Sequence, residues 1–433
     1  MLKKILETIG TRYLIALLNL ALIFINAKTL GIEGVGLVGI IVASINMAVI
    51  FNSILCGNTI VYFMNRYSMH AIFLPSYLWT FVGAALACVG MQLTGLLPEA
   101  YGKDIYIISV ISSLVTANAR FLLGKDCIRG FNITHMLQGG LLFFLLLYYY
   151  YVEKQQEVGA YVSALYLTNG IAFAASFILL VPWLRKREEE NCYNGKSLYS
   201  LLKEMFTYGL WSGADNLAEV CTTRLNYFLI QQLAGLGSVG LLDAGTKISE
   251  SVWHISRSVS FIEYSSIART SDPEEQRQIT LKLFKLTLCA TTGTMLCIVC
   301  IPEWVYTNYL FSQEFTGMRN VIWALSAGIV ALGCNSIVGH YFIGSGKIRY
   351  STASSCVGLL TLLVAGSALI PSWGVIGSAI STSIAFCAML AFSLTVFIRQ
   401  TSTRLHEFLP TRKEAEELKR KVMARLGKRD KER

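Results

Sequence analysis

The chain is poor in charged residues. Only 15% of its 433 residues are Asp, Glu, Lys or Arg, whereas soluble domains carry about 25%. This shortage excludes a set of ordinary water-soluble domains. The longest segment between apolar runs, 185–204, is also too short for a nucleotide-hydrolysing domain, which disfavours an ATP-driven pump.

Catalytic and metal-binding motifs are scarce as well. The five histidines are far apart, and neither a nucleophile elbow nor a His-Glu-x-x-His helix occurs. Gly344-Ser345-Gly346-Lys347 resembles part of a phosphate-binding loop, but Ile348 follows the lysine and Tyr341 replaces the first glycine. The eleven cysteines are scattered singly through apolar segments, which indicates reduced thiols. We therefore expect a non-enzyme without a metal or other cofactor.

Long apolar runs are what the chain has instead. Hydrophobic residues make up 54% of it, and its mean hydropathy is +0.52. Most runs reach the roughly 20 residues that a helix needs to cross a bilayer. The prediction is an all-α integral membrane fold with twelve spans: 11–30, 37–62, 72–97, 104–124, 131–152, 158–184, 205–233, 239–265, 281–302, 319–344, 351–371 and 374–399.

The basic residues predict the orientation of these spans. Lys and Arg gather in alternate loops, and the opposite side receives only Lys28, Lys103, Lys154 and Arg319. Because cytoplasmic loops are enriched in Lys and Arg, both termini are predicted to be cytoplasmic. The net charge of +10 is thus interpreted as membrane topology, with no nucleic-acid partner expected.

The spans divide into two similar halves. An N-terminal lobe, 1–184, and a C-terminal lobe, 205–399, flank a cytoplasmic linker, 185–204, and a solvated basic tail follows at 400–433. Residues 30–37 and 234–241 share two glycines and a Val-Gly-Leu sequence at an offset of 204 residues. Parallel repeats of this kind predict two six-helix lobes related by a pseudo-two-fold axis, with a central hydrated cleft. The alternative is that glycine-rich hairpins recur in any helical membrane protein.

Charged residues inside the spans are the candidate site. Span 239–265 places Asp243, Lys247, Glu250, His254 and Arg257 within an arc of about 80° on one helix face. Each costs about 2.5–3.5 kcal/mol at the bilayer centre, so the stripe cannot face lipid. It either neutralises itself through pairs three and four residues apart or lines a hydrated cavity. The candidate substrate-binding residues are Lys247, Arg257, Arg224, Arg120, Asp215, Glu219 and Glu250, and the candidate proton-coupling pair is His254 with Glu250.

The equivalent positions of the first half are neutral. At the same offset of 204, Lys247 corresponds to Ala43, Glu250 to Asn46 and Arg257 to Ser53. We therefore expect the second lobe to recognise the charged part of a substrate. Asparagines of the first lobe either bind substrate or make helix contacts: Asn19, Asn46, Asn52 and Asn58.

Several short motifs carry a family resemblance: Leu30-Gly31 with Glu33 and Gly36, then Gly240, Gly344–Lys347 and Ile370–Ala379. With these the chain resembles the bacterial polysaccharide transporter family, which includes O-antigen and exopolysaccharide flippases, within the multidrug/oligosaccharidyl-lipid/polysaccharide exporter superfamily. The resemblance implies an inner-membrane transporter that moves undecaprenyl-diphosphate-linked oligosaccharides to the periplasmic leaflet. A polymerase and glycosyltransferases are the partners it suggests.

The candidate residues suit that substrate. Lys247, Arg257, Arg224 and Arg120 could meet the diphosphate, and Asp215, Glu219 and Glu250 could accept hydrogen bonds from sugar hydroxyls. A cation-coupled multidrug antiporter is the alternative, with Asp215 or Glu219 as the cation-binding carboxylate. A membrane glycosyltransferase ranks last, because such enzymes usually need a large extracytoplasmic loop.

Overall fold

The computed structural model describes residues 2–64, 66–185, 198–267, 270 and 272–409. Every regular element within these ranges is helical. The first half of the chain contains α1 (Leu2–Cys56), α2 (Asn58–Met64), α3 (Met69–Leu93), η1 (Glu99–Tyr101), α4 (Gly102–Gly124), α5 (Ile128–Leu147), η2 (Tyr148–Val152) and α6 (Val158–Leu184). The second half contains α7 (Leu198–Ile267), α8 (Pro273–Val299), α9 (Glu303–Val305), η3 (Tyr306–Leu310), η4 (Gln313–Phe315), α10 (Met318–Gly344), α11 (Ile348–Thr401) and η5 (Leu405–Phe408).

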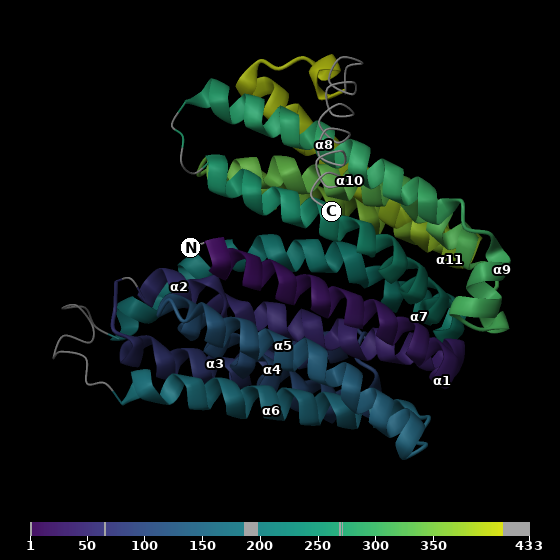
Figure 1. The fold of residues 1–433 in the computed structure, drawn as a ribbon, viewed down its shortest axis with the longest axis horizontal. Helices are drawn as coiled ribbons and strands as arrows, with labels where there is room; N and C mark the ends of the chain where they lie inside the picture. The colour runs from purple at the N-terminus through teal and green to yellow at the C-terminus, as the bar shows by residue number, and fades with distance from the viewer. Residues whose placement is uncertain (1, 65, 186–197, 268–269, 271, 410–433) are drawn as a thin grey trace, which may run out of the picture.

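The helices form two groups with two long helices between them. Figure 1 shows α3 to α6 in the lower part of the view and α8, α10 and α11 in the upper part. The long helices α1 and α7 pack against each other, and α7 also packs against α10 and α11. The candidate site lies on α7, the helix that contacts both groups.

Three of the long helices are double spans. Each contains one glycine with a non-helical backbone: Gly31 in α1, Gly235 in α7 and Gly374 in α11. All three have a positive φ, of 69°, 78° and 53°, a conformation that glycine adopts without the steric cost other residues carry. The described residues contain nine helices long and apolar enough to cross a membrane. With three of them bent at glycine, this count is consistent with the twelve predicted spans.

The helix ends differ from the predicted span ends in two places. The span predicted at 37–62 is broken, because α1 ends at Cys56 and the separate helix α2 begins at Asn58. Helix α7 starts at Leu198, inside the predicted linker, because Lys203 and Glu204 interrupt hydropathy without interrupting a helix. Part of the predicted solvated tail is also ordered, since residues 405–408 form η5 and Phe408 is only 4% exposed. The remainder of the tail, 410–433, lies outside the described residues.

The repeat at an offset of 204 residues has a direct structural counterpart. A methyl group added to Gly36 would lie 2.1 Å from the carbonyl oxygen of Leu236, and one added to Gly240 would lie 2.0 Å from that of Ile32. Adding 204 to 36 gives 240, and subtracting 204 from 236 gives 32, so the two contacts are equivalent under the repeat. Helices α1 and α7 therefore cross with their backbones in contact, at a point of local two-fold symmetry.

Two further contacts join the halves near the glycine turns. The Ile32 amide donates to Glu314 of η4 at 2.9 Å, so Glu314 accepts from the backbone just after the Gly31 bend. The Gln232 amide group donates to the Gly95 carbonyl at 3.5 Å. The two halves are thus tied together at the end of the molecule where α1 and α7 turn.

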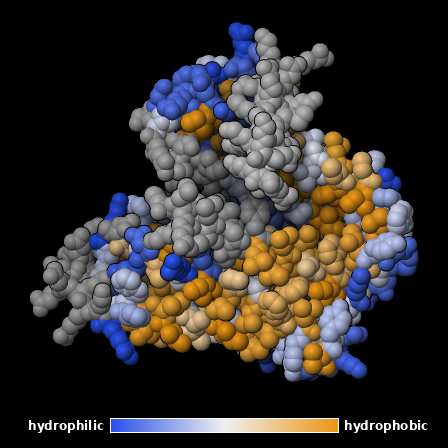
Figure 2. All heavy atoms as spheres, in the orientation of Figure 1, coloured by the Kyte–Doolittle hydropathy of each residue, from blue (hydrophilic) through white to orange (hydrophobic). Residues whose placement is uncertain are grey.

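The surface has the polarity of a membrane protein. Figure 2 shows a broad apolar area across the middle of the lower group, with hydrophilic residues at its left and right ends. Large apolar side chains are exposed at intervals of four along α3, at Leu78, Val82 and Leu86, and on α11 at Leu360 and Val364. Such a face needs a lipid environment. The chain is a multi-pass membrane protein.

Candidate functional site

The bend at Gly235 brings the charged residues of α7 together. Residues 198–234 form a first arm and residues 236–267 a second arm that runs back along it. Arg224 of the first arm pairs with Glu250 of the second, with Nη2 and Oε2 2.7 Å apart. Glu219 and Arg257 form a second pair, at 3.7 Å between Oε1 and Nη2. The two pairs are in antiparallel register, so the arms share one row of charges.

The Arg224–Glu250 pair is the more enclosed of the two. Arg224 Nη1 also donates to the Tyr227 hydroxyl at 2.6 Å, and Tyr227 itself is buried. Such charge-assisted bonds are stronger than neutral ones. The spacing along the second arm predicts that Glu250 pairs with Lys247, three residues away, and with His254, four residues away. In the structure Glu250 instead forms its ion pair with Arg224 of the first arm.

Lys247 forms the one predicted pair that the structure contains. Its Nζ lies 2.7 Å from Asp243 Oδ2, and Asp243 is buried. The Asp243 carboxyl carbon lies 3.2 Å from the position a Cβ would take on Gly39 of α1. The absence of a side chain at Gly39 therefore leaves room for Asp243 where α1 and α7 pack. The Lys247 side chain remains 29% exposed.

Arg257 is the most open cation of the group. Half of its side chain is exposed, and its guanidinium carbon lies 3.8 Å above the centre of the Trp253 ring. Trp253 is held in turn, because its Nε1 donates to Ser336 of α10 at 2.8 Å. A guanidinium on an aromatic face keeps its donor groups directed outward. Arg257 is therefore positioned to meet an anion without losing its support.

The other predicted residues are distributed more widely. His254 is exposed on the second arm of α7, one turn from Glu250 and one turn from Arg257. Arg120 is half-buried on α4, in the first half of the chain. The side chain of Asp215 lies outside the described residues. The structure thus brings Arg224, Glu250, Glu219, Arg257 and Lys247 together on α7.

Sequence reasoning missed the aromatic members of this group. Tyr227 and Trp253 hold the two arginines, and each lies three or four residues from its arginine on the same arm. That spacing is a usable signal, but aromatic residues are so frequent in apolar spans that it does not single these two out. The first-half asparagines differ from one another. Asn46 is exposed, whereas Asn52 is buried and donates to Ser113 at 2.7 Å and to the Thr80 carbonyl at 3.1 Å.

The chemistry of the site is ionic. Among the described residues of α7, three cations and three carboxylates form three ion pairs, two between the arms and one within the second arm. Within the part of the chain that the structure describes, no three His, Cys, Asp or Glu side chains are grouped to hold a metal. The pairs differ in exposure and length, and the 3.7 Å pair is the weakest contact. An anionic ligand would meet Arg257 and Lys247 first.

Comparisons with solved structures identify the fold. The chain superposes on an inward-facing multidrug resistance MATE family transporter of the MOP superfamily with a TM-score of 0.70 and 14% identity, over 90% of this chain and 94% of that one. On the inward closed conformation of the lipid II flippase MurJ the TM-score is 0.69 with 13% identity, over 93% and 89% of the two chains. A MOP superfamily transporter from Pyrococcus furiosus matches with a TM-score of 0.55 and 14% identity, over 92% and 94%.

Sequence comparisons add little. No family model matches the chain. A segment of 113 residues, 26% of the chain, is 30% identical to an uncharacterized membrane protein of Methanocaldococcus jannaschii and spans only 22% of that relative. The all-helical fold is therefore the one seen in these MATE and MurJ structures.

Proposed function

We propose that the protein is a flippase for polyprenyl-diphosphate-linked oligosaccharides in the bacterial inner membrane, used in surface polysaccharide synthesis. The observation that carries the proposal is the pair of partly exposed cations on α7, Arg257 and Lys247, each of which lies against a carboxylate. A diphosphate concentrates negative charge and would exchange with these carboxylates. The fold shared with the MurJ structure, which is titled a lipid II flippase, supports a substrate of this class.

The ion pairs suggest how the headgroup is bound. When a diphosphate takes the guanidinium of Arg257, it frees Glu219 at the 3.7 Å pair to accept hydrogen bonds from sugar hydroxyls. Arg224 and Glu250 lie one to two turns farther toward the bend and extend the same row. The polyprenyl tail remains in the lipid, where its apolar carbons need no protein partner.

Alternating access follows from the two-lobe arrangement. In this proposal the lobes 1–184 and 205–399 rock about the Gly36–Gly240 crossing, with both termini in the cytoplasm. The headgroup enters at the cytoplasmic end and leaves after the contacts at Glu314 and Gly95 have opened. A polymerase and glycosyltransferases would then act on either side of this step.

The test is complementation of a gene deletion in the native host. Lys247→Ala and Arg257→Ala are each expected to lower surface polysaccharide at least tenfold, because each removes a cation that meets the diphosphate, while membrane levels stay normal. Lys282→Ala is the matched control, since Lys282 is an exposed cation on α8 away from the row. Normal polymer in both site variants would overturn the proposed role of these cations.

The shared fold with a MATE transporter supports one other candidate, a cation-coupled multidrug antiporter. In that case Glu219 or Asp215 would bind the cationic substrate, and Glu250 with His254 would carry the coupling proton. Overexpression would then confer drug resistance that Glu219→Gln abolishes, and deletion would leave surface polysaccharide unchanged. That pair of results would replace the flippase proposal with the antiporter.

A further inference from the structure

One carboxyl group in the second half takes no part in the charged row. Glu263 lies on the second arm of α7, one turn before the helix ends at Ile267. It is completely buried, and neither of its carboxyl oxygens has a hydrogen-bond partner among the described residues. The hydroxyl that faces it belongs to Thr280 of α8, and that hydroxyl donates to the Gln276 carbonyl at 2.9 Å. An ionised carboxylate in such a place would have no compensating charge.

The surroundings of Glu263 are apolar. Val259 and Ile267, one turn on either side of it, belong to a cluster formed with Leu281 and Phe284 of α8 and with α10 and α11. The titratable groups in this cluster are Cys334 and Tyr341 of α10 and Tyr350 of α11. Helix α8 carries the cations Arg277, Lys282 and Lys285, of which Arg277 pairs with Glu274 and Glu407.

Buried serine and threonine residues of α7 and α8 lie beyond Glu263 along the two helices. Ser256 and Ser260 continue the Glu263 face of α7, and the buried Thr287 and Thr291 lie on α8. The Ser256 hydroxyl and the Thr291 methyl both approach Gly333 of α10, at 2.5 and 3.2 Å from the position a Cβ would take. The Ser256 and Thr287 hydroxyl oxygens have no hydrogen-bond partner among the described residues. Buried polar side chains therefore continue from Glu263 along α7 and α8.

A proton fits this environment better than a metal cation does. Hard cations take about six oxygen ligands, whereas among the described side chains the hydroxyl of Thr280 is the one that faces the Glu263 carboxyl. A protonated carboxyl group is neutral and needs no ligands. In an apolar cluster it avoids the free-energy cost of burying an unpaired charge.

We propose that Glu263 is a proton-binding site of the C-terminal half, neutral while α7 and α8 are closed around it. The proton would leave to water when the cytoplasmic ends of the two helices separate. Its coupling to transport rests on the proposed function, whereas the protonation itself does not.

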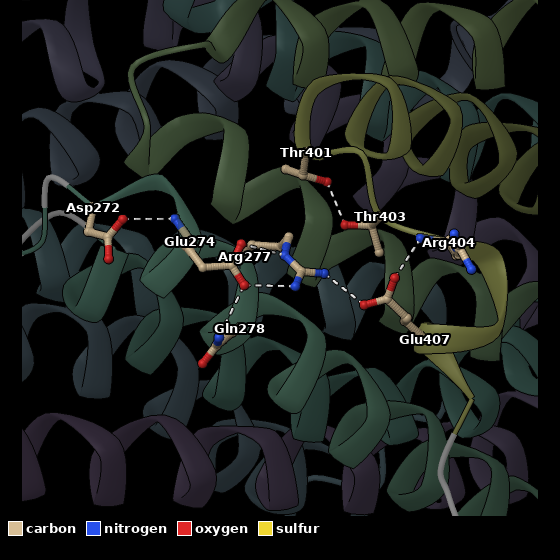
Figure 3. Close-up of polar contacts among 8 residues, drawn as sticks. All are labelled: Asp272, Glu274, Arg277, Gln278, Thr401, Thr403, Arg404 and Glu407. Atoms are coloured by element: carbon tan, nitrogen blue, oxygen red, sulfur yellow. Dashed lines mark hydrogen bonds and ion pairs between the residues drawn. The ribbon is translucent and has the colours of Figure 1, made fainter.

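The segment after α11 packs on this cluster. Phe408 of η5 packs on Phe284 of α8 and Phe397 of α11, with ring centres 5.0 and 5.7 Å apart. Figure 3 shows the ion pair that holds η5, in which Arg277 of α8 reaches Glu407. Release of η5 would uncover the cytoplasmic side of the apolar cluster that contains Val259 and Ile267.

Infrared difference spectra of the full-length protein in nanodiscs test the protonation. At pH 7 the wild type is expected to show the carbonyl band of a protonated carboxyl group, and Glu263→Gln is expected to lose it. Glu275→Gln is the matched control and is expected to keep the band, because Glu275 is an exposed carboxyl group at the start of α8. Glu263→Gln keeps the size of the side chain, and a thermal melt identifies a misfolded sample. Spectra of wild type and a folded Glu263→Gln variant that coincide at pH 7 would overturn the site.

A transport assay tests the coupling separately. In inverted vesicles, an imposed pH gradient is expected to change the uptake of polyprenyl-diphosphate-linked oligosaccharide by the wild type several-fold. It is expected to have no effect on uptake by Glu263→Gln. If the band is lost but the response to the gradient persists, the carboxyl group binds a proton that transport does not use, and the coupling is wrong. The infrared result does not depend on which substrate class is correct, so its failure is distinguishable from failure of the flippase proposal.

Discussion

At the scale of single residues, the Arg224–Glu250 pair affects stability most when only one of its partners is removed. The two side chains are mostly buried, and their 2.7 Å contact is supported by the Tyr227 hydroxyl. A buried pair contributes little against an apolar replacement, because both charges lose their water. Loss of one partner alone is different, since it leaves the other charge buried and uncompensated.

Arg224→Gln is therefore expected to destabilise the protein by about 3–5 kcal/mol. The double variant Arg224→Gln with Glu250→Gln should recover most of that loss, because no unpaired charge remains. Thermal unfolding in detergent gives the comparison, and Arg349→Gln is the control, since Arg349 lies on a tyrosine ring at the start of α11. A double variant as unstable as the single one would show that the pair is not coupled.

At the scale of elements, η5 combines an aromatic contact with a polar one. Its neighbourhood is polar and basic, which predicts a solvated tail, whereas Phe408 packs against α8 and α11. Figure 3 shows Glu407 between the Arg404 backbone amide, which donates to it at 2.8 Å, and the Arg277 guanidinium, at 2.7 Å. These two contacts lower the pKa of Glu407 below its ordinary value.

Docking of η5 should consequently weaken in acid. A carboxyl group whose pKa is lowered in the folded state contributes stability above its ordinary pKa of about 4.3 and loses it as the pH falls through the lowered value. The protection factors of the backbone amides of residues 402–409 against hydrogen exchange should therefore fall below about pH 4. Glu407→Gln should show low protection factors already at neutral pH, and protection in that variant as high as in the wild type would contradict the proposed anchor.

The elements also show what the sequence could reveal. Hydropathy located the spans because burial in lipid depends on composition, and the repeated glycines located the turns of α1 and α7 because only glycine accepts those backbone angles cheaply. The partner of Glu250 was not predictable in this way. Arg224 lies on another span, and which residues face each other across the bend depends on how the two arms of α7 pack.

At the scale of the whole molecule, the two halves meet on backbone rather than on side chains. Gly36 and Gly240 allow α1 and α7 to approach until carbonyl oxygens occupy the space where a Cβ would be. Close contact of this kind between membrane helices favours small residues. Because α1 and α7 touch closely at these two glycines, the crossing suits the pivot of the proposed rocking motion between the lobes.

Gly240→Ala is expected to force α1 and α7 apart and to cost about 1–3 kcal/mol, the usual range for overpacking. The expected readout is a lower melting temperature together with a lower transport rate. Gly159→Ala and Gly170→Ala are matched controls, because a methyl group there meets nothing within 4 Å. If Gly240→Ala behaved like these two, the close crossing would not be needed for folding or motion.

The placement of the ion pairs within a single helix limits what can break them. Arg224–Glu250 and Glu219–Arg257 each connect two arms of α7, so in the proposed rocking motion both partners would move with the same lobe. Such a motion would leave these pairs unchanged, whereas it would break the Ile32–Glu314 bond, which joins the two halves. Under this proposal the ion pairs would respond to the substrate and the Ile32–Glu314 bond to the motion.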